Sequence, residues 1–142
     1  MKIGLITIHY ANSYGGLLQA YAAQYSLSKY GEVEIIDYKT DHLEKSMQLI
    51  RYKDGPRSVL RIAKDVFRII PRFRALNLFK KFINSNFYLS DPCRDHESFI
   101  RVASKYNYVV SGSDQIWNPK IIAGLDSIYF LDGDIDGKKI AF

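Results

Sequence analysis

The sequence predicts an α/β protein built on a parallel sheet, and three observations carry this prediction. Residues 3–8 form a continuous β-branched and apolar run after Lys2, and residues 32–38 and 106–110 are further segments rich in apolar residues, as expected for the strands of a buried parallel sheet. Segments with a helical pattern separate these runs. The chain has 142 residues with 47% hydrophobic content, which suits a single domain with a core of its own.

The first 38 residues predict one βαβ unit with a right-handed crossover. Residues 2–8 form the central strand and residues 32–38 the second strand, with Gly31 ending the helix between them. That helix covers residues 17–30, and its predicted apolar face consists of Leu18, Tyr21, Ala22 and Tyr25.

The stretch from residue 39 to about residue 90 predicts a basic helical insertion into the single domain, which spans residues 1–142. Its helical pattern is interrupted at residues 54–56 (Asp-Gly-Pro) and at Pro71. We expect two or three helices on one side of the sheet, because apolar side chains recur along its second half: Leu76, Phe79, Phe82, Ile83 and Phe87.

The last third of the chain predicts a short helix at residues 95–105 and the third strand at residues 106–110. Two further segments, residues 127–131 and 138–142, are expected to be extended. The turn between them is marked by two glycines, Gly133 and Gly137.

Composition predicts a cytoplasmic protein. No stretch reaches the roughly 20 consecutive apolar residues that span a bilayer, and residues 1–8 are too short for the apolar region of a signal peptide. The single cysteine, Cys93, cannot form an internal disulfide, which fits a reducing compartment. A nucleophilic Cys93 would need a neighbouring base, and the sequence predicts none.

Half of the 20 lysines and arginines lie between Arg51 and Lys81, where only Asp54 and Asp65 are acidic. One interpretation is a solvated helix face. The other is a surface for anionic lipid headgroups at the inner face of the membrane, or for a lipid-linked, phosphate-bearing acceptor. Nucleic acid is not expected as a partner, because no nucleic-acid-binding motif accompanies the basic residues. The apolar partners of such a surface would be Leu60, Phe67, Ile70 and Phe73.

Two polar clusters follow apolar runs and define the candidate site. The first polar cluster is residues 9–16 (HYANSYGG), and the second is residues 111–119 (SGSDQIWNP). Open α/β sheets bind their ligands at the carboxyl ends of the strands. Asp37 ends the second strand, where a dinucleotide-binding protein holds a ribose hydroxyl, but the spaced glycine fingerprint of such proteins is absent.

The first polar cluster and the helix after it supply five candidates. His9 can act as an acid or base near neutral pH, or serve as a hydrogen-bonded structural residue. Gly15 and Gly16 offer backbone N–H groups to an anion at a helix N-terminus, or only allow the turn. Asn12 and Gln19 can donate and accept hydrogen bonds, which suits sugar hydroxyls.

The second polar cluster places two hydroxyls, a carboxylate, two carboxamides and an indole beside a buried strand. The structural alternative is a capped helix N-terminus, with Ser113 or Asp114 as the N-cap and Trp117 buried. Asp114 is the candidate catalytic residue. The candidates for substrate binding are Ser111, Gly112, Ser113, Gln115, Trp117 and Asn118.

These residues resemble the polysaccharide pyruvyl transferase family. Residues 112–118 carry that family's Gly-Ser-Asp-Gln-x-Trp-Asn signature, and the start of the chain matches it at residues 6–9, Asn12, Gly15 and residues 19–22. The resemblance runs almost from end to end, although a typical member is more than twice as long. It implies a Rossmann-like sheet with flanking helices, similar to the N-terminal half of a GT-B-like transferase.

The resemblance also implies a reaction. These enzymes transfer the enolpyruvyl group of phosphoenolpyruvate to a sugar hydroxyl, forming a pyruvate ketal during surface polysaccharide biosynthesis. Asp114 and His9 would orient or deprotonate the acceptor, a sugar or a lipid-linked glycan. Phosphoenolpyruvate is the donor substrate, and no further cofactor or metal is required by the sequence.

The groups that hold phosphoenolpyruvate in the family have no match in residues 1–142, so the resemblance predicts that the isolated chain is inactive. Two other functions remain open. One is a non-catalytic, truncated paralogue that binds a glycan, a lipid-linked sugar or a partner subunit. The other is a different α/β transferase or a nucleotide-binding domain.

Overall fold

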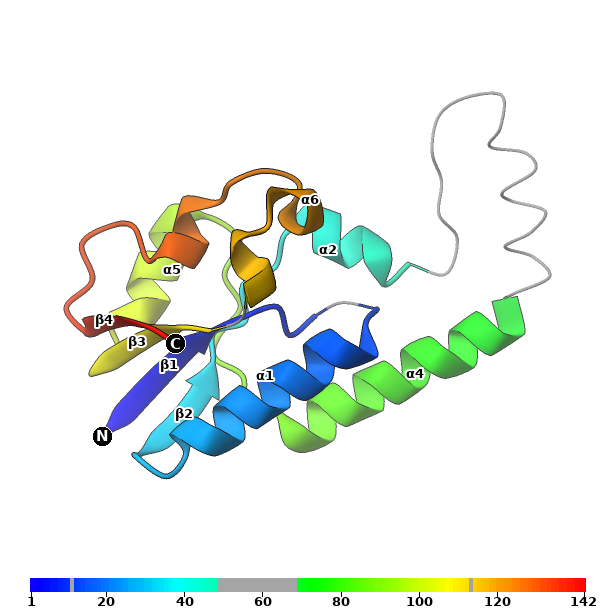
Figure 1. Cartoon of the computed structure of the whole chain (residues 1–142), viewed down its shortest axis with the longest axis horizontal. Coiled ribbons are helices and arrows are strands. Elements are labelled where there is room, and N and C mark those ends of the chain that lie inside the picture. The colour runs from blue at the N-terminus through cyan, green and yellow to red at the C-terminus, as the bar shows by residue number, and fades with distance from the viewer. Residues whose placement is uncertain (11, 49–68, 113) are drawn as a thin grey trace.

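The fold is a parallel four-stranded sheet with helices on both faces (Figure 1). The computed structural model describes residues 1–10, 12–48, 69–112 and 114–142. The strand order is β2-β1-β3-β4, and all three pairings are parallel. The predicted α/β class and parallel sheet are thereby confirmed. The strands are β1 (Lys2–Ile6), β2 (Glu32–Ile35), β3 (Tyr108–Ser111) and β4 (Lys138–Ala141).

Helix α1 (Tyr14–Leu27) connects β1 to β2, as predicted, but the predicted apolar face is wrong. Its buried residues are Leu17, Ala20, Ala23, Gln24 and Leu27. The four residues predicted to be buried are instead exposed: Leu18, Tyr21, Ala22 and Tyr25. The helix carries no charged side chain. Its sequence therefore does not distinguish a polar face from an apolar face, and this is why the prediction of the buried face failed.

The role predicted for Gly31 is also wrong. Helix α1 ends at Leu27, with Ser28 as its C-cap, before the chain reaches Gly31. A Cβ atom on Gly31 would collide with the carbonyl oxygen of Met1. This glycine is therefore required by the close approach of two backbones where β2 begins beside β1.

The described part of the insertion contains helices α2 (Asp41–Ser46) and α4 (Ile69–Asn86). The predicted break at residues 54–56 and the apolar residues Leu60 and Phe67 lie outside the described residues. The expectation of a single covered side is wrong for these helices. Leu43 of α2 belongs to one core cluster, whereas Leu76, Phe79 and Ile83 of α4 belong to the cluster on the other face of the sheet.

Pro71 does not interrupt the helical pattern. It lies within α4, whose described residues begin at Ile69.

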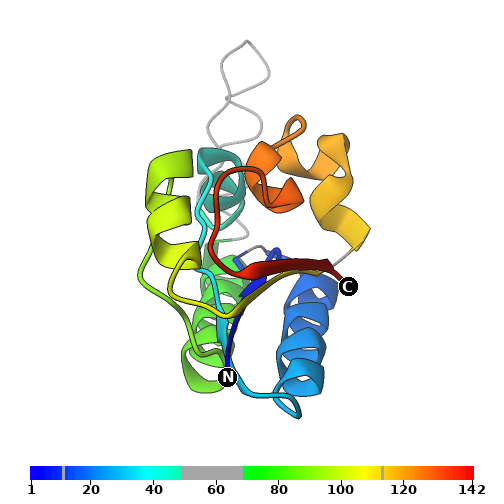
Figure 2. The same cartoon turned by 90° about the vertical axis from the view of Figure 1, so that its left-hand side faces the viewer.

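Helices α1 and α4 lie side by side on one face of the sheet (Figures 1 and 2). Two aromatic pairs join them: Tyr14 with Phe79, whose ring centroids are 4.6 Å apart, and Tyr21 with Phe82, at 5.9 Å. None of the helices in the described ranges is both long and apolar enough to cross a bilayer.

The other face of the sheet is covered by α5 (His96–Ala103), α6 (Pro119–Ile122) and two short 3₁₀ helices, η1 (Asp114–Trp117) and η2 (Ser127–Phe130). Helix α5 confirms the helix predicted at residues 95–105, and β4 confirms the extended segment at residues 138–142. The extended segment predicted at residues 127–131 is wrong, because the side chain of Asp126 caps η2 there.

Candidate functional site

The two polar clusters lie at the same edge of the sheet. Strands β1 and β3 are parallel neighbours in which Ile6 is paired with Ser111. The backbone N–H of Gly112 donates to the carbonyl oxygen of Ile6 at 3.0 Å, just where both strands end. Both clusters therefore leave the sheet at its carboxyl edge, where open parallel sheets bind ligands.

His9 lies at this edge, but inside the protein. Its residue surface is 1% exposed. Nε2 is 2.9 Å from Oδ1 of Asp37, and Nδ1 is 3.2 Å from the carbonyl oxygen of Thr7. Both partners are acceptors, so the two bonds can form together only when both ring nitrogens carry hydrogen. The imidazole faces protein groups on both sides in this structure.

Asp37 joins His9 to Lys39. Oδ2 of Asp37 is 3.0 Å from Nζ of Lys39, and the Asp37 side chain is 8% exposed. Burial raises the pKa of Asp37, but the hydrogen bonds from His9 and Lys39 lower it, and the net pKa lies below its ordinary value. We call His9, Asp37 and Lys39 the strand-end trio.

We did not predict from the sequence that these three residues would lie together. A signal was present, because His9 and Asp37 follow the ends of two strands that proved to be neighbours. Both carboxylate oxygens of Asp37 are engaged by protein groups, so this carboxylate is not arranged for the ribose hydroxyl weighed from the sequence.

The N-terminus of α1 carries the two candidate glycines. Ser13 is the N-cap of α1, and the N–H of Gly16 donates to its Oγ at 3.3 Å, so the cap already uses one donor of this turn. Gly15 is exposed, and a Cβ atom placed on it would meet no atom within 4 Å. Asn12 is partly buried and Gln19 is exposed.

A small cleft connects Gln19 with Gly112. Its volume is about 240 Å³, somewhat less than the roughly 300–1,000 Å³ of a complete ligand pocket. None of the side chains that line it is charged, so it suits an uncharged part of a ligand better than a phosphate. The lining residues are Thr7, Gln19, Ala22, Ala23, Ser26, Gly112 and Phe142.

In the second polar cluster, two side chains hold the loop against η2. The buried Ser111 hydroxyl donates to the carbonyl oxygen of Tyr129 at 2.7 Å, and Nε1–H of Trp117 points to the same oxygen at 3.4 Å. The Trp117 ring stacks on Phe130, with centroids 6.4 Å apart. Trp117 is nevertheless 39% exposed, so it is not the buried residue that the capping alternative predicted.

A second helix, α6, follows in this cluster and has an N-cap of its own. Residues 114–117 form the turn η1, and α6 begins only at Pro119, with Asn118 as its N-cap. Oδ1 of Asn118 accepts from the N–H of Lys120, and its Nδ2 donates to Oε1 of the exposed Gln115, both at 3.1 Å. Asn118 and Gln115 thus form one polar unit. Ser113 and the side chain of Asp114 lie outside the described residues.

Cys93 is not arranged as a nucleophile. It is 1% exposed. Burial, and then the charges of Asp37 and Asp95, raise the pKa of its thiol to about 12. The thiol therefore stays protonated at neutral pH, and only the thiolate is a strong nucleophile.

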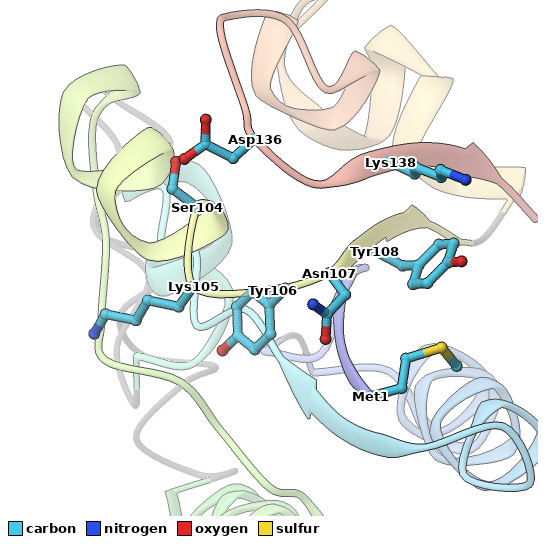
Figure 3. A pocket seen from close by; sticks show the side chains of 8 residues that line it. All are labelled: Met1, Ser104, Lys105, Tyr106, Asn107, Tyr108, Asp136 and Lys138. Atoms are coloured by element: carbon cyan, nitrogen blue, oxygen red, sulfur yellow. The ribbon is translucent and has the colours of Figure 1, made fainter.

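Figure 3 shows the side chains that line a larger cavity, of about 650 Å³. None of the residues that line this cavity belongs to either polar cluster. Its lining includes Met1 and Lys138, at the amino ends of β1 and β4, so it is at the opposite edge of the sheet. Residues such as Lys105, Asp136 and Lys138 give it charges of both signs. Because Lys105 is already paired with Asp91 at 2.6 Å, we assign no part of the candidate site to this cavity.

Within the described ranges, no group of three or more His, Cys, Asp or Glu residues is arranged to hold a metal ion. Comparison with family models, curated proteins and solved structures gives no match to this chain. We therefore infer the function of this chain from the geometry of the carboxyl edge.

Proposed function

We propose that this chain is the acceptor-binding α/β portion of a polysaccharide pyruvyl transferase. The observation that supports the proposal most directly is the pairing of β1 with β3. This pairing brings residues 9–16 and residues 111–119 to one edge of the sheet, as a single site built from both clusters requires.

The proposed reaction joins a sugar to phosphoenolpyruvate in two steps. A sugar hydroxyl attacks C2 of phosphoenolpyruvate, a general base takes the hydroxyl proton, and a general acid protonates C3. A second hydroxyl of the same sugar then attacks C2, losing its proton as the C2–O bond to phosphate breaks. The products are the cyclic pyruvate ketal and inorganic phosphate.

In this proposal Asp114 is the base that acts on the acceptor hydroxyl. Gln115 and Asn118 form a polar unit beside it, and Trp117 offers a partly exposed ring. Gln19 of α1 lines the cleft beside Gly112, and Asn12 lies in the first polar cluster, which follows β1. Amide groups and an aromatic ring suit a sugar, which presents hydroxyls around its rim and C–H groups on its faces.

The structural members of the site would be Ser111, Gly112 and His9. Ser111 and Gly112 fix the start of the second cluster through their bonds to Tyr129 and Ile6. His9 is bonded on both nitrogens and buried. We therefore propose that it positions the first cluster through Asp37, instead of contacting the acceptor.

The acceptor side is favoured over the donor side by charge. The cleft between Gln19 and Gly112 is lined by uncharged residues, whereas phosphoenolpyruvate would require cationic groups or several free backbone N–H donors. One such donor, on Gly16, is already used by the Ser13 cap. Gly15 is the remaining candidate of the two for an anion.

A membrane contact belongs to the same proposal. In the described part of the basic stretch, Arg74, Lys80 and Lys81 are exposed on α4, as are the apolar Ile70 and Phe73. Arg72 is engaged differently, because its guanidinium donates to the carbonyl oxygen of Gln48. Exposed cations beside apolar side chains suit anionic headgroups at the inner membrane face, where a lipid-linked acceptor is presented.

Glycan binding without catalysis is the second candidate function. It is favoured by one observation: His9, one of the two predicted acid–base groups, is buried, and both of its ring nitrogens face protein acceptors. A protein that only binds would need the same edge but no proton transfer.

The test measures phosphate release from phosphoenolpyruvate by the product of the complete reading frame, with a pool of lipid-linked glycans as acceptors. Acceptor-dependent release is the expected result. A parallel NMR titration of the 142-residue chain with the same glycans follows the amides of residues 9–19 and 111–118. Binding at these residues without phosphate release would replace the enzyme with the second candidate, and the absence of both would overturn the proposal.

A further inference from the structure

We propose that a second cleft, at the opposite end of α1, binds an uncharged sugar unit. The cleft has a volume of about 570 Å³, within the roughly 300–1,000 Å³ of ligand pockets. It lies where the ends of α1 and α4 meet the beginning of β2 (Figure 1). Its lining residues are Tyr21, Gln24, Tyr25, Ser28, Gly31, Glu32, Val33, Glu34, Ser85, Asn86 and Tyr88.

Two exposed tyrosines give the cleft its ring surfaces. Tyr25 is 63% exposed and Tyr88 is 72% exposed. Each is large, flat and apolar on its faces, and each carries a hydroxyl that can form hydrogen bonds at its rim. The apolar C–H face of a pyranose ring can pack on such a surface while the sugar hydroxyls meet polar groups around it.

The fold holds the ring of Tyr25 and the backbone of Tyr88 in place. The Tyr25 ring stacks on Tyr21, with centroids 6.4 Å apart, and Tyr21 in turn meets the edge of Phe82. The backbone of Tyr88 is fixed at both ends, because its N–H donates to Oε1 of Gln24 and its carbonyl oxygen accepts from the N–H of Ile35. The Tyr25 ring is ordered before binding, so it loses little entropy when a ligand arrives.

The floor of the cleft is a hydrogen-bonded unit around Gln24. Gln24 is 6% exposed, and its Nε2 donates to the carbonyl oxygen of Asn86 at 2.9 Å. Nδ2 of Asn86 donates to the carbonyl oxygen of Phe82 at 2.8 Å. The bond from Gln24 to Asn86 ties α1 to the end of α4 and so joins the two walls of the cleft.

The charge of the lining selects the kind of ligand. Its charged side chains are Glu32 and Glu34, and the lining contains no lysine, arginine or histidine. Glu34 is already bonded to the hydroxyl of Tyr106 at 2.5 Å, whereas Glu32 is exposed. Carboxylates accept hydrogen bonds from sugar hydroxyls and repel phosphates, sulfates and uronic acids. The cleft therefore fits a neutral sugar and disfavours a nucleotide.

This inference stands apart from pyruvyl transfer, since the cleft shares no lining residue with the two polar clusters. Its test uses NMR titration of the 142-residue chain with four neutral tetrasaccharides, made of glucose, galactose, mannose or N-acetylglucosamine. Tetragalacturonate is the acidic counterpart of the galactose tetramer. We expect at least one neutral tetrasaccharide to shift the amides of Tyr25, Ser28, Glu32 and Tyr88. Tetragalacturonate should bind at least about tenfold more weakly than the galactose tetramer.

Three variants and one control sharpen the test. Tyr25→Ala and Tyr88→Ala should each weaken binding about tenfold, or about 1.4 kcal/mol. Glu32→Lys should reverse the preference toward tetragalacturonate. Tyr30→Ala is the matched control. Tyr30 also precedes β2 in the sequence and is 69% exposed, but it does not line the cleft. Thermal melting of every variant separates lost binding from lost folding.

The proposal fails if none of the four neutral tetrasaccharides binds, or if Tyr30→Ala weakens binding as much as Tyr25→Ala and Tyr88→Ala do. It also fails if tetragalacturonate binds as well as the galactose tetramer. A basic proline-rich peptide that shifts the same amides when no sugar does would identify a protein partner and overturn the sugar assignment. None of these outcomes depends on phosphoenolpyruvate, so they can be told apart from failure of the proposed enzyme activity.

Discussion

His9 and Asp37 meet across the ends of two neighbouring strands, with Nε2 of His9 2.9 Å from Oδ1 of Asp37. Taken as whole residues, His9 is 1% exposed and Asp37 is 5% exposed. Nζ of Lys39 lies 3.0 Å from the other carboxylate oxygen of Asp37. The Asp37 backbone is fixed as well, since its N–H donates to Oγ of Ser90 and its carbonyl oxygen accepts from the N–H of Cys93. The strand-end trio thus ties the first polar cluster to the sheet.

Asp37→Asn should destabilise the protein at pH 7 by about 1–3 kcal/mol, because the buried groups around it lose a charged partner. The pKa of Asp37 is lowered in the folded protein, so its carboxylate stabilises the fold above the ordinary pKa of 3.8. That contribution is lost as the pH falls through the lower folded pKa. Urea unfolding between pH 2.5 and 7 should therefore show the wild type and the variant converging below about pH 4.

Asp134→Asn serves as the control for this experiment, because Asp134 is exposed. It should change the free energy of unfolding by less than about 0.5 kcal/mol at any pH. A constant gap between wild type and Asp37→Asn over the whole pH range would show that the charge of Asp37 contributes nothing.

The Cys93 thiol should be nearly inert in the folded protein. With its pKa raised to about 12 by burial and by Asp37 and Asp95, its thiolate fraction at pH 8 is about a thousandfold below that of an ordinary thiol. The rate of modification by a disulfide reagent at pH 8 should rise by at least that factor when the chain is unfolded in urea. Rapid labelling of the folded chain would contradict the buried placement of Cys93.

Gly4→Ala should destabilise the protein by about 1–3 kcal/mol through overpacking. A Cβ atom there would lie 2.5 Å from Cδ2 of Tyr106, and that ring is 4% exposed and held by its bond to Glu34. The measurement is urea unfolding of the wild type and the variant at pH 7.

Gly15→Ala is the matched control for Gly4→Ala. Gly15 lies in the first turn of α1 with open space around its Cα, so an alanine there should stabilise the helix by about 0.5–1 kcal/mol. Equal effects of the two substitutions would mean that the contact between Gly4 and Tyr106 does not limit the packing.

Asp114→Asn tests the base proposed for pyruvyl transfer. In the product of the complete reading frame, loss of the carboxylate should lower kcat on the order of 100-fold, the lower bound usual for acid–base groups. If Asp114 only helps to cap the turn, turnover should be unchanged and stability should change by about 1 kcal/mol or less, because Asn caps nearly as well as Asp. Kinetics and melting of the same purified variant decide between the two, with Asp134→Asn as the control.

The sequence was sufficient to predict the sheet and the common edge of the two clusters. The runs at residues 2–8, 32–38 and 106–110 are rich in β-branched, aromatic and other apolar residues, a pattern that suits strands of a sheet covered on both faces. Parallel strands place their carboxyl ends on one edge. Once β1 and β3 pair, the two clusters that follow them must therefore leave the sheet together.

Only the tertiary structure shows which face of α1 is buried and which residue is the hydrogen-bond partner of His9. Helix α1 has apolar side chains all round and no charge, so only packing against the sheet could select Leu17 and Ala20 over Leu18 and Tyr21 as its buried face. The hydrogen-bond partner of His9 is likewise set by the tertiary structure. Asp37 lies 28 residues away along the chain, but the two side chains meet at the ends of neighbouring strands. A local sequence pattern shows how apolar a segment is. Whether a polar side chain can be buried depends on which residues, often distant in sequence, form hydrogen bonds with it in the folded protein.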